Sequence, residues 1–142
     1  MRADRMRPGE SLDLVIDASV LVNILTRAEG PTPDADPLLG DAASLHAPEV
    51  IDLEVVQAFR RMMRNRVMTE RRAQEAIDLL ADLPIHRHPH QPMVERIWAH
   101  RASCTAYDAS YLALAEGLGA TLVTADAGLA RTAAAFVTVE HR

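Results

Sequence analysis

The segment Thr105–Asp126 reads TAYDASYLALAEGLGATLVTAD and gives the clearest indication of the fold in the chain. Residues 106–117 are rich in Ala and Leu and are expected to form a helix, which Gly117 or Gly119 would end. The short apolar run 121–124 is expected to form a buried strand. A helix followed by a tight turn and a short buried strand is typical of an α/β protein.

The same alternation of short apolar runs and helical segments extends over the rest of the chain. Strands are expected at 12–16, 45–47, 83–88, 121–124 and 136–139, and helices at 18–27, 37–43, 49–65, 69–82, 92–101, 106–117 and 127–134. This order predicts an α/β/α sandwich with a mostly parallel central sheet flanked by helices. Residues 1–11 are expected to be a flexible leader, and residues 12–142 to form a single domain.

The composition is that of an ordinary globular protein, with 49% hydrophobic and 25% charged residues among 142. No apolar run approaches the roughly 20 residues that span a bilayer, so no membrane association is expected. The chain has one cysteine, Cys104, which cannot form an internal disulfide and favours a reducing, cytoplasmic location. The net charge is −5 and every basic residue is arginine. This balance neither requires nor excludes RNA as a partner.

Three aspartates stand at positions where α/β proteins place functional groups. Asp17 directly follows the first expected strand, and Asp126 follows the strand 121–124. Because open parallel sheets bind ligands beyond the carboxyl ends of their strands, both side chains should face one crevice. Asp108 lies in the first turn of the helix that starts at residue 106.

Glu54 is a fourth candidate because it lies on an apolar helix face. Its neighbours one turn away are Val50, Ile51, Gln57 and Ala58. A carboxylate that enters the core side needs a compensating partner, and a divalent cation is an effective one. Asp52 is a rival on the same helix, although its neighbours define its direction less clearly.

Each of these acids also has a purely structural explanation. Asp17 and Asp126 could be N-caps of the helices that follow them. Thr105 and Asp108 have the spacing of a capping box. Glu54 could extend along the helix surface to reach solvent. The combination of all four residues, rather than any one of them, favours a functional site.

The chain resembles the PIN-domain family, and within it the VapC-type toxins of bacterial VapBC toxin–antitoxin pairs. The resemblance in order and spacing covers nearly everything from residue 12 to residue 139. The strongest match is TAYDASYLALAE at 105–116, followed by LVTAD at 122–126. The segments LVIDASVLVN at 14–23 and LEVVQAFRR at 53–61 also match.

The resemblance implies an acidic pocket that holds Mg²⁺, or Mn²⁺ as a substitute, for cleavage of RNA. Its catalytic and metal-binding residues would be Asp17, Glu54, Asp108 and Asp126, with Asp17 and Asp108 as the main ligands and with supporting polar groups from Ser19, Asn23 and Thr124. The resemblance further implies a homodimer and a small antitoxin partner. A helix of the antitoxin would bind in a groove formed by the helices 18–27, 49–66 and 69–82.

The chemistry of the four carboxylates supports this interpretation independently. Clustered carboxylates repel each other and RNA phosphate unless a divalent cation lies between them. Oxygen ligands suit Mg²⁺ or Mn²⁺, and no His or Cys set favours zinc. We hypothesise that the metal activates a water for in-line attack, which leaves 5′-phosphate and 3′-hydroxyl ends. The alternatives are a non-catalytic interaction module on the same scaffold and, more remotely, an α/β phosphatase, for which the chain lacks an activating lysine.

Several basic residues are candidates for contact with RNA. Those considered are Arg60, Arg61, Arg64 and Arg101, with His100 beside the last of them; a solvated face is the alternative for each. The run His86-Arg87-His88-Pro89-His90 has a histidine at every second position, which suggests a further metal site. Pro89 interrupts a regular strand there, and acidic partners are lacking nearby. Exposed polar histidines are therefore the favoured interpretation.

Overall fold

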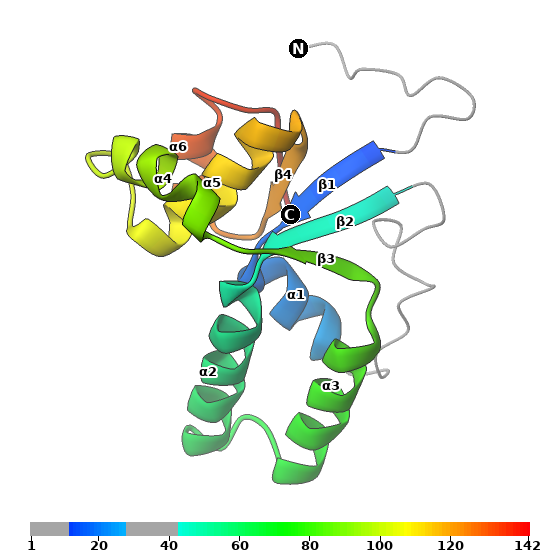
Figure 1. Cartoon of the computed structure of the whole chain (residues 1–142). Coiled ribbons are helices and arrows are strands. Elements are labelled where there is room, and N and C mark those ends of the chain that lie inside the picture. The colour runs from blue at the N-terminus through cyan, green and yellow to red at the C-terminus, as the bar shows by residue number, and fades with distance from the viewer. Residues whose placement is uncertain (1–11, 28–42) are drawn as a thin grey trace.

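The centre of the fold is a five-stranded parallel sheet, as the sequence predicts (Figure 1). The structure is a computed structural model that describes residues 12–27 and 43–142. The strands are β1 (Leu12–Ile16), β2 (Ala43–Pro48), β3 (Ile85–His88), β4 (Thr121–Thr124) and β5 (Val139–His141), in the spatial order β3-β2-β1-β4-β5. Every neighbouring pair in this sheet is parallel.

Helices cover both faces of the sheet and make the predicted three-layer sandwich (Figure 1). One face carries α1 (Ala18–Leu25), α2 (Val50–Arg64) and α3 (Glu70–Asp82), and the other carries α4 (Val94–Ala99), α5 (Ala106–Leu118) and α6 (Ala127–Ala133). A 3₁₀ turn, η3 (Gln91–Met93), precedes α4. None of the described helices is long and apolar enough to cross a bilayer.

The strand order reverses direction at β1, which places a crevice at the carboxyl ends of β1 and β4. The chain first moves outward from β1 to β2 and β3, and then returns to β4 on the other side of β1. Because the crossovers that leave β1 and β4 lie on opposite faces of the sheet, the helices α1 and α6 that follow these strands diverge from each other. Ligands of open α/β sheets bind at such a point.

The core holds the site-bearing elements in place. Val15, Ile16, Leu122 and Val123, in the central strands, have no exposed surface. Helix α5 is buried on all sides from Ala109 to Ala115. Each large apolar side chain removed from water contributes about 1.5–3 kcal/mol, so the middle of α5 is firmly attached to the sheet. The helix ends at Gly119, in the left-handed conformation with φ of 61°, as one of the two predicted glycine stops.

The last strand differs from its predicted position at 136–139. The backbone N–H groups of Phe136 and Val137 both donate to the carbonyl of Ala133, at 2.9 and 3.0 Å. These bonds continue the turn that ends α6, so β5 begins only at Val139. The helix expected at 92–101 is the 3₁₀ turn followed by the shorter α4.

Two further predictions fall outside the described residues. They are the flexible leader at 1–11 and most of the short helix at 37–43, whose last residue begins β2. The domain boundary at residue 12 therefore stays a prediction.

Candidate active site

Asp17 lies at the end of β1 and is held by three hydrogen-bond donors. Its Oδ1 accepts from the Ser19 hydroxyl at 2.6 Å and from the Val20 N–H at 3.1 Å. Its Oδ2 accepts from the Thr124 hydroxyl at 2.5 Å. The residue is only 5% exposed, and a buried carboxylate needs such partners. These bonds fix the direction of the Asp17 side chain.

The loop after β4 is joined to the loop after β1 through the same two hydroxyls. The Ser19 hydroxyl accepts from the Ala125 N–H, and the Thr124 hydroxyl accepts from the Asp126 N–H, each at 3.0 Å. Asp126 is exposed and caps α6 by accepting from the Leu129 N–H at 2.9 Å. Ser19 and Thr124 therefore position the two aspartates that follow the central strands.

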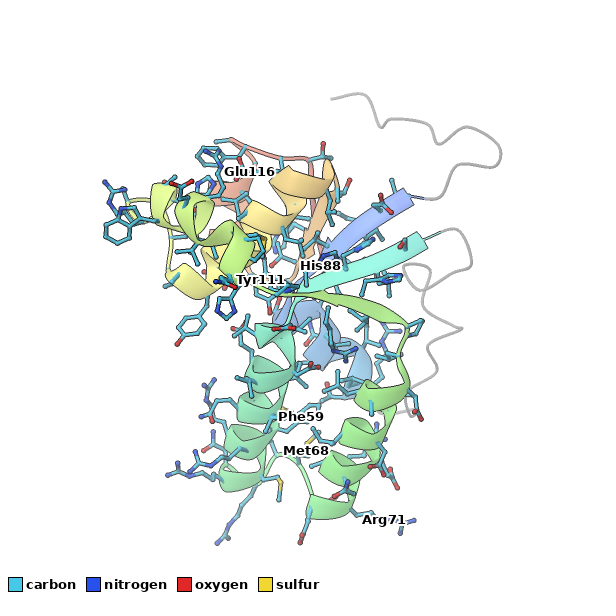
Figure 2. All side chains as sticks on the ribbon, in the orientation of Figure 1. Phe59, Met68, Arg71, His88, Tyr111 and Glu116 are labelled. Atoms are coloured by element: carbon cyan, nitrogen blue, oxygen red, sulfur yellow. The ribbon has the colours of Figure 1, made fainter. Side chains whose placement is uncertain are left out.

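Glu54 enters the same region from α2 and meets a buried tyrosine. The Tyr111 hydroxyl donates to Glu54 Oε1 at 2.7 Å, while the tyrosine itself is 1% exposed (Figure 2). Burial raises the pKa of Glu54, and the negative charges of Asp108 and Asp17 raise it further, whereas the hydrogen bond from Tyr111 lowers it. The side chain is thus directed toward Tyr111 on α5 by a specific contact.

Asp108 completes the acidic cluster from the first turn of α5. The Thr105 hydroxyl accepts from the Asp108 N–H at 3.1 Å and caps the helix. Burial raises the pKa of the Asp108 carboxyl, and the charges of Asp126 and Asp17 add to this effect. Asp17 therefore acts electrostatically on both Glu54 and Asp108, and Asp126 acts on Asp108.

The donor set suits a hard divalent cation that keeps part of its water shell. Among residues 12–27 and 43–142, no three His, Cys, Asp or Glu side chains converge as a ready-made metal cage. Mg²⁺ typically uses one or two protein carboxylates together with waters and substrate phosphates. Burial, and then repulsion by neighbouring carboxylates, raise the pKa values of Glu54 and Asp108, and such a cation would offset both effects.

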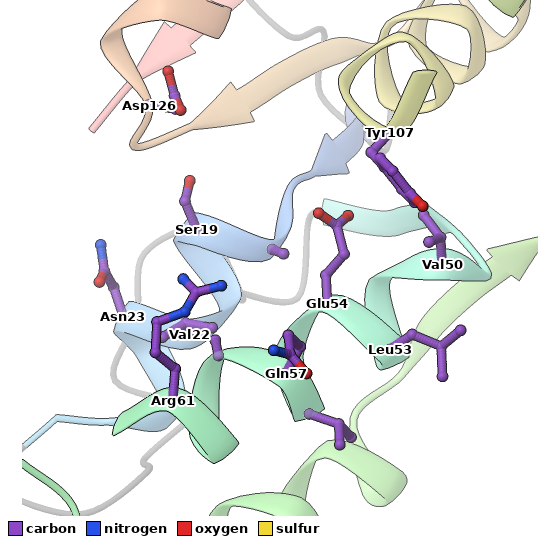
Figure 3. Close-up of a pocket in the computed structure, with 13 residues that line it drawn as sticks. Ser19, Val22, Asn23, Val50, Leu53, Glu54, Gln57, Arg61, Tyr107 and Asp126 are labelled. Atoms are coloured by element: carbon purple, nitrogen blue, oxygen red, sulfur yellow. The ribbon is translucent and has the colours of Figure 1, made fainter. Parts of the chain in front are cut away.

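A cleft of about 940 Å³ is lined by two of these acids, Glu54 and Asp126, whereas Asp17 and Asp108 are not among its lining residues (Figure 3). Its polar lining comes from Ser19, Asn23, Glu54, Gln57, Arg61, Tyr107 and Asp126, and its apolar lining from Ala18, Val22, Val50, Leu53, Val56 and Ala58. Acidic groups and the guanidinium of Arg61 therefore border the same cleft. Tyr107 stands at its wall with 62% of its surface exposed.

The other basic candidates are distributed differently. Arg60 and Arg64 are exposed on α2 but do not line this cleft. The Arg101 guanidinium lies 4.6 Å from the ring centroid of Trp98. The prediction for His100 is wrong, because the side chain is 3% exposed and hydrogen-bonds to Glu116 at 2.5 Å.

The sequence also allowed a purely structural role, such as helix capping, for the acidic residues, and this role applies to some of them. Asp17 and Asp126 do cap α1 and α6. The same two residues also belong to the acidic cluster. Asp52 forms an ion pair with Arg87 at 2.7 Å and does not belong to the cluster. Tyr111 was not anticipated, although a tyrosine one turn after Asp108 on an apolar helix must find a partner for its hydroxyl.

Comparison with known proteins agrees with this fold. The family model of the PIN domain matches residues 14–135. Ribonuclease VapC3 of Mycobacterium tuberculosis is 34% identical over 131 residues, which cover 92% of this chain and 93% of that protein. Ribonuclease VapC12 of the same species is 32% identical over 119 residues, covering 84% and 91%. The chain belongs to the PIN domain family.

Two solved structures share the fold. PAE2754 from Pyrobaculum aerophilum superposes with a TM-score of 0.62 at 21% identity, over 90% of this chain and 89% of that one. The structure of FitAB bound to an IR36 DNA fragment gives a TM-score of 0.54 at 19% identity, covering 90% and 94%. At this level of identity the likeness concerns the fold alone.

Proposed function

We propose that this protein is a Mg²⁺-dependent endoribonuclease and the toxin of a VapBC-type toxin–antitoxin module. The observation that carries the proposal is electrostatic: the charge of Asp17 acts on both Glu54 and Asp108, and that of Asp126 acts on Asp108, beside the point where the strand order reverses. The names of the VapC relatives support ribonuclease activity and a toxin role.

Asp17 and Asp108 are the proposed main metal ligands. Asp17 is suited to this role because its three donors hold the carboxylate in a fixed orientation. Asp126 is exposed at the mouth of the site and accessible to waters or to a second ion. Mg²⁺ bound there would lower the pKa of a water and offset the charge that develops on the phosphate.

Glu54 is the proposed proton acceptor. Its pKa is raised by burial and by the neighbouring acids, which brings its basicity closer to neutral pH. The Tyr111 hydroxyl holds Oε1 and so orients the carboxylate. A group with this pKa shift and a fixed direction is suited to accept a proton from a reacting water.

The cleft is the proposed path of the RNA. Arg61 offers a guanidinium for a phosphate, and the exposed ring of Tyr107 offers a surface on which an unpaired base can stack. Single-stranded loops are the favoured targets because their bases are free to be splayed and read. Arg60, Arg64 and Arg101 remain proposed contacts outside this cleft.

The apolar wall of the cleft is the proposed antitoxin site. Val22 of α1 and Val50, Leu53 and Val56 of α2 line it, and Leu53 is 71% exposed. An amphipathic helix of a small antitoxin would cover these side chains and block the acids. Helix α3 contributes none of the lining residues, so α1 and α2 form this groove without it. A homodimer would place two such clefts side by side.

The chemistry of the RNA ends tests the proposed reaction. We expect cleavage of total cellular RNA in Mg²⁺ to leave 5′-phosphate and 3′-hydroxyl ends, because water is the attacking group. The ends are identified by ligation and by phosphatase sensitivity of the fragments. Products with 2′,3′-cyclic phosphate would mean attack by the RNA 2′-hydroxyl and would overturn the proposal.

A further inference from the structure

Three histidines meet on one face of the strands β2 and β3. The parallel register pairs His46 with His86, and His88 follows two residues later on the same face. The Nδ1 of His46 lies 2.8 Å from the Nε2 of His88. The rings of His46 and His86 are stacked, with centroids 5.0 Å apart and an interplanar angle of 25°. His90, the third member of the sequence run, lies beyond the strand and outside this cluster.

We propose that this cluster is a second metal site, which binds Zn²⁺ through His46, His86 and His88. Neutral imidazole nitrogens are preferred ligands of Zn²⁺ and compete poorly for Mg²⁺. His86 and His88 are alternate residues of β3, and His46 lies on the neighbouring strand β2. The sheet backbone therefore holds all three imidazole donors. The four carboxylates of the proposed active site are not part of this cluster.

The change of geometry needed to bind the ion is small. Nitrogen ligands at about 2.0–2.1 Å around a tetrahedral Zn²⁺ lie about 3.3 Å apart. His46 and His88 would therefore separate by about half an ångström from their present contact. The His86 ring must turn, since no three such donors converge in the described residues. Its side chain is exposed, so this rotation breaks no core packing.

The groups around these imidazoles favour the neutral ring with a free nitrogen, which is the form that binds metal. The Nε2 of His46 contacts the Ser44 hydroxyl at 3.0 Å and an Asp13 carboxylate oxygen at 3.5 Å. A proton on Nε2, held by these acceptors, leaves Nδ1 available as a ligand. Burial lowers the pKa of His88, and the neighbouring His46 and His86 add to this effect, which favours the neutral ring at neutral pH.

A metal ion at this position would join the edge strand β3 to β2. The Glu49 N–H donates to the His88 carbonyl at 2.9 Å, just before α2 begins. The site therefore lies close to the start of the helix that carries Glu54. Because the folded arrangement of the imidazoles is absent from the unfolded chain, Zn²⁺ should raise the melting temperature.

The test is a calorimetric titration of the untagged, full-length protein with Zn²⁺. Millimolar Mg²⁺ in the buffer occupies carboxylate sites without competing for imidazoles. We expect one bound Zn²⁺ per chain, with affinity reduced about tenfold or more in His46→Gln, His86→Gln and His88→Gln. The matched control is His90→Gln, an exposed histidine of the same run, which should bind as the wild type does.

Because His86 is exposed, His86→Gln should fold as the wild type does. A loss of Zn²⁺ binding in this variant then reports the loss of a ligand and not of the fold. The rise in melting temperature caused by Zn²⁺ should also be lost in His86→Gln and retained in His90→Gln. Failure of the wild-type protein to take up Zn²⁺ in the presence of Mg²⁺ would overturn the proposal. Equal affinity of the wild type, His86→Gln and His88→Gln would overturn it as well.

Discussion

Asp17→Asn is expected to lower the rate of RNA cleavage in Mg²⁺ by about a thousandfold or more, equivalent to about 4 kcal/mol of transition-state stabilisation. The substitution removes a charged oxygen from the most firmly oriented carboxylate of the site. Folding should be retained, because Asn is as good an N-cap as Asp and can still accept from the Val20 N–H. Rates are measured on one RNA substrate at fixed Mg²⁺, beside thermal unfolding of both proteins.

Asp13→Asn is the matched control for this prediction. Asp13 lies on β1, four residues before Asp17, and its side chain is 48% exposed. We expect this variant to cleave RNA at the wild-type rate. If Asp17→Asn and Asp13→Asn cleave equally well, Asp17 is a helix cap and nothing more.

Tyr111→Ala is expected to destabilise the protein by about 3–5 kcal/mol, the range for truncating a large buried aromatic side chain. Tyr111 is among the largest fully buried side chains and packs between α5 and the rest of the core. Its loss leaves a cavity beside Glu54 and removes a hydrogen bond to that carboxylate. Urea denaturation monitored by circular dichroism measures the change in the free energy of unfolding. A loss below about 1 kcal/mol would contradict the assigned packing.

Tyr111→Phe separates the role of the hydroxyl from that of the ring. The aromatic packing is kept, so the stability loss should be only about 1 kcal/mol. The hydrogen bond from Tyr111 lowers the pKa of Glu54, so its removal should raise that pKa further. If Glu54 accepts a proton in its ionised form, the acid limb of the pH–rate profile then moves to higher pH. An unchanged profile in Tyr111→Phe would remove Glu54 from the proton-transfer role.

Much of the fold follows from local sequence patterns. Short apolar runs such as 12–16 and 121–124 form strands whose last three residues are buried on both faces of the sheet. Asp17 and Asp126 were identifiable because each directly follows such a run. Glu54 was identifiable because a carboxylate on an apolar helix face is costly unless it has a partner.

Contacts between distant segments could not be predicted in the same way. Tyr111 and Glu54 are 57 residues apart, and only the packing of α5 near α2 brings them together. His46 joins His86 and His88 through the register of β2 and β3, which periodicity does not determine. The late start of β5 depends on hydrogen bonds to the carbonyl of Ala133, which apolar patterning does not reveal.

The most direct test of the proposed active site is cleavage of one RNA preparation with Mg²⁺ present, removed by EDTA and then restored. We expect the wild-type protein to produce discrete fragments with Mg²⁺, none in EDTA, and the same fragments once Mg²⁺ is returned. Asp108→Asn should produce none under any of these conditions while melting as a folded protein. Cleavage that persists in EDTA, or that Asp108→Asn carries out as well as the wild type, would contradict a metal-dependent site built from these acids.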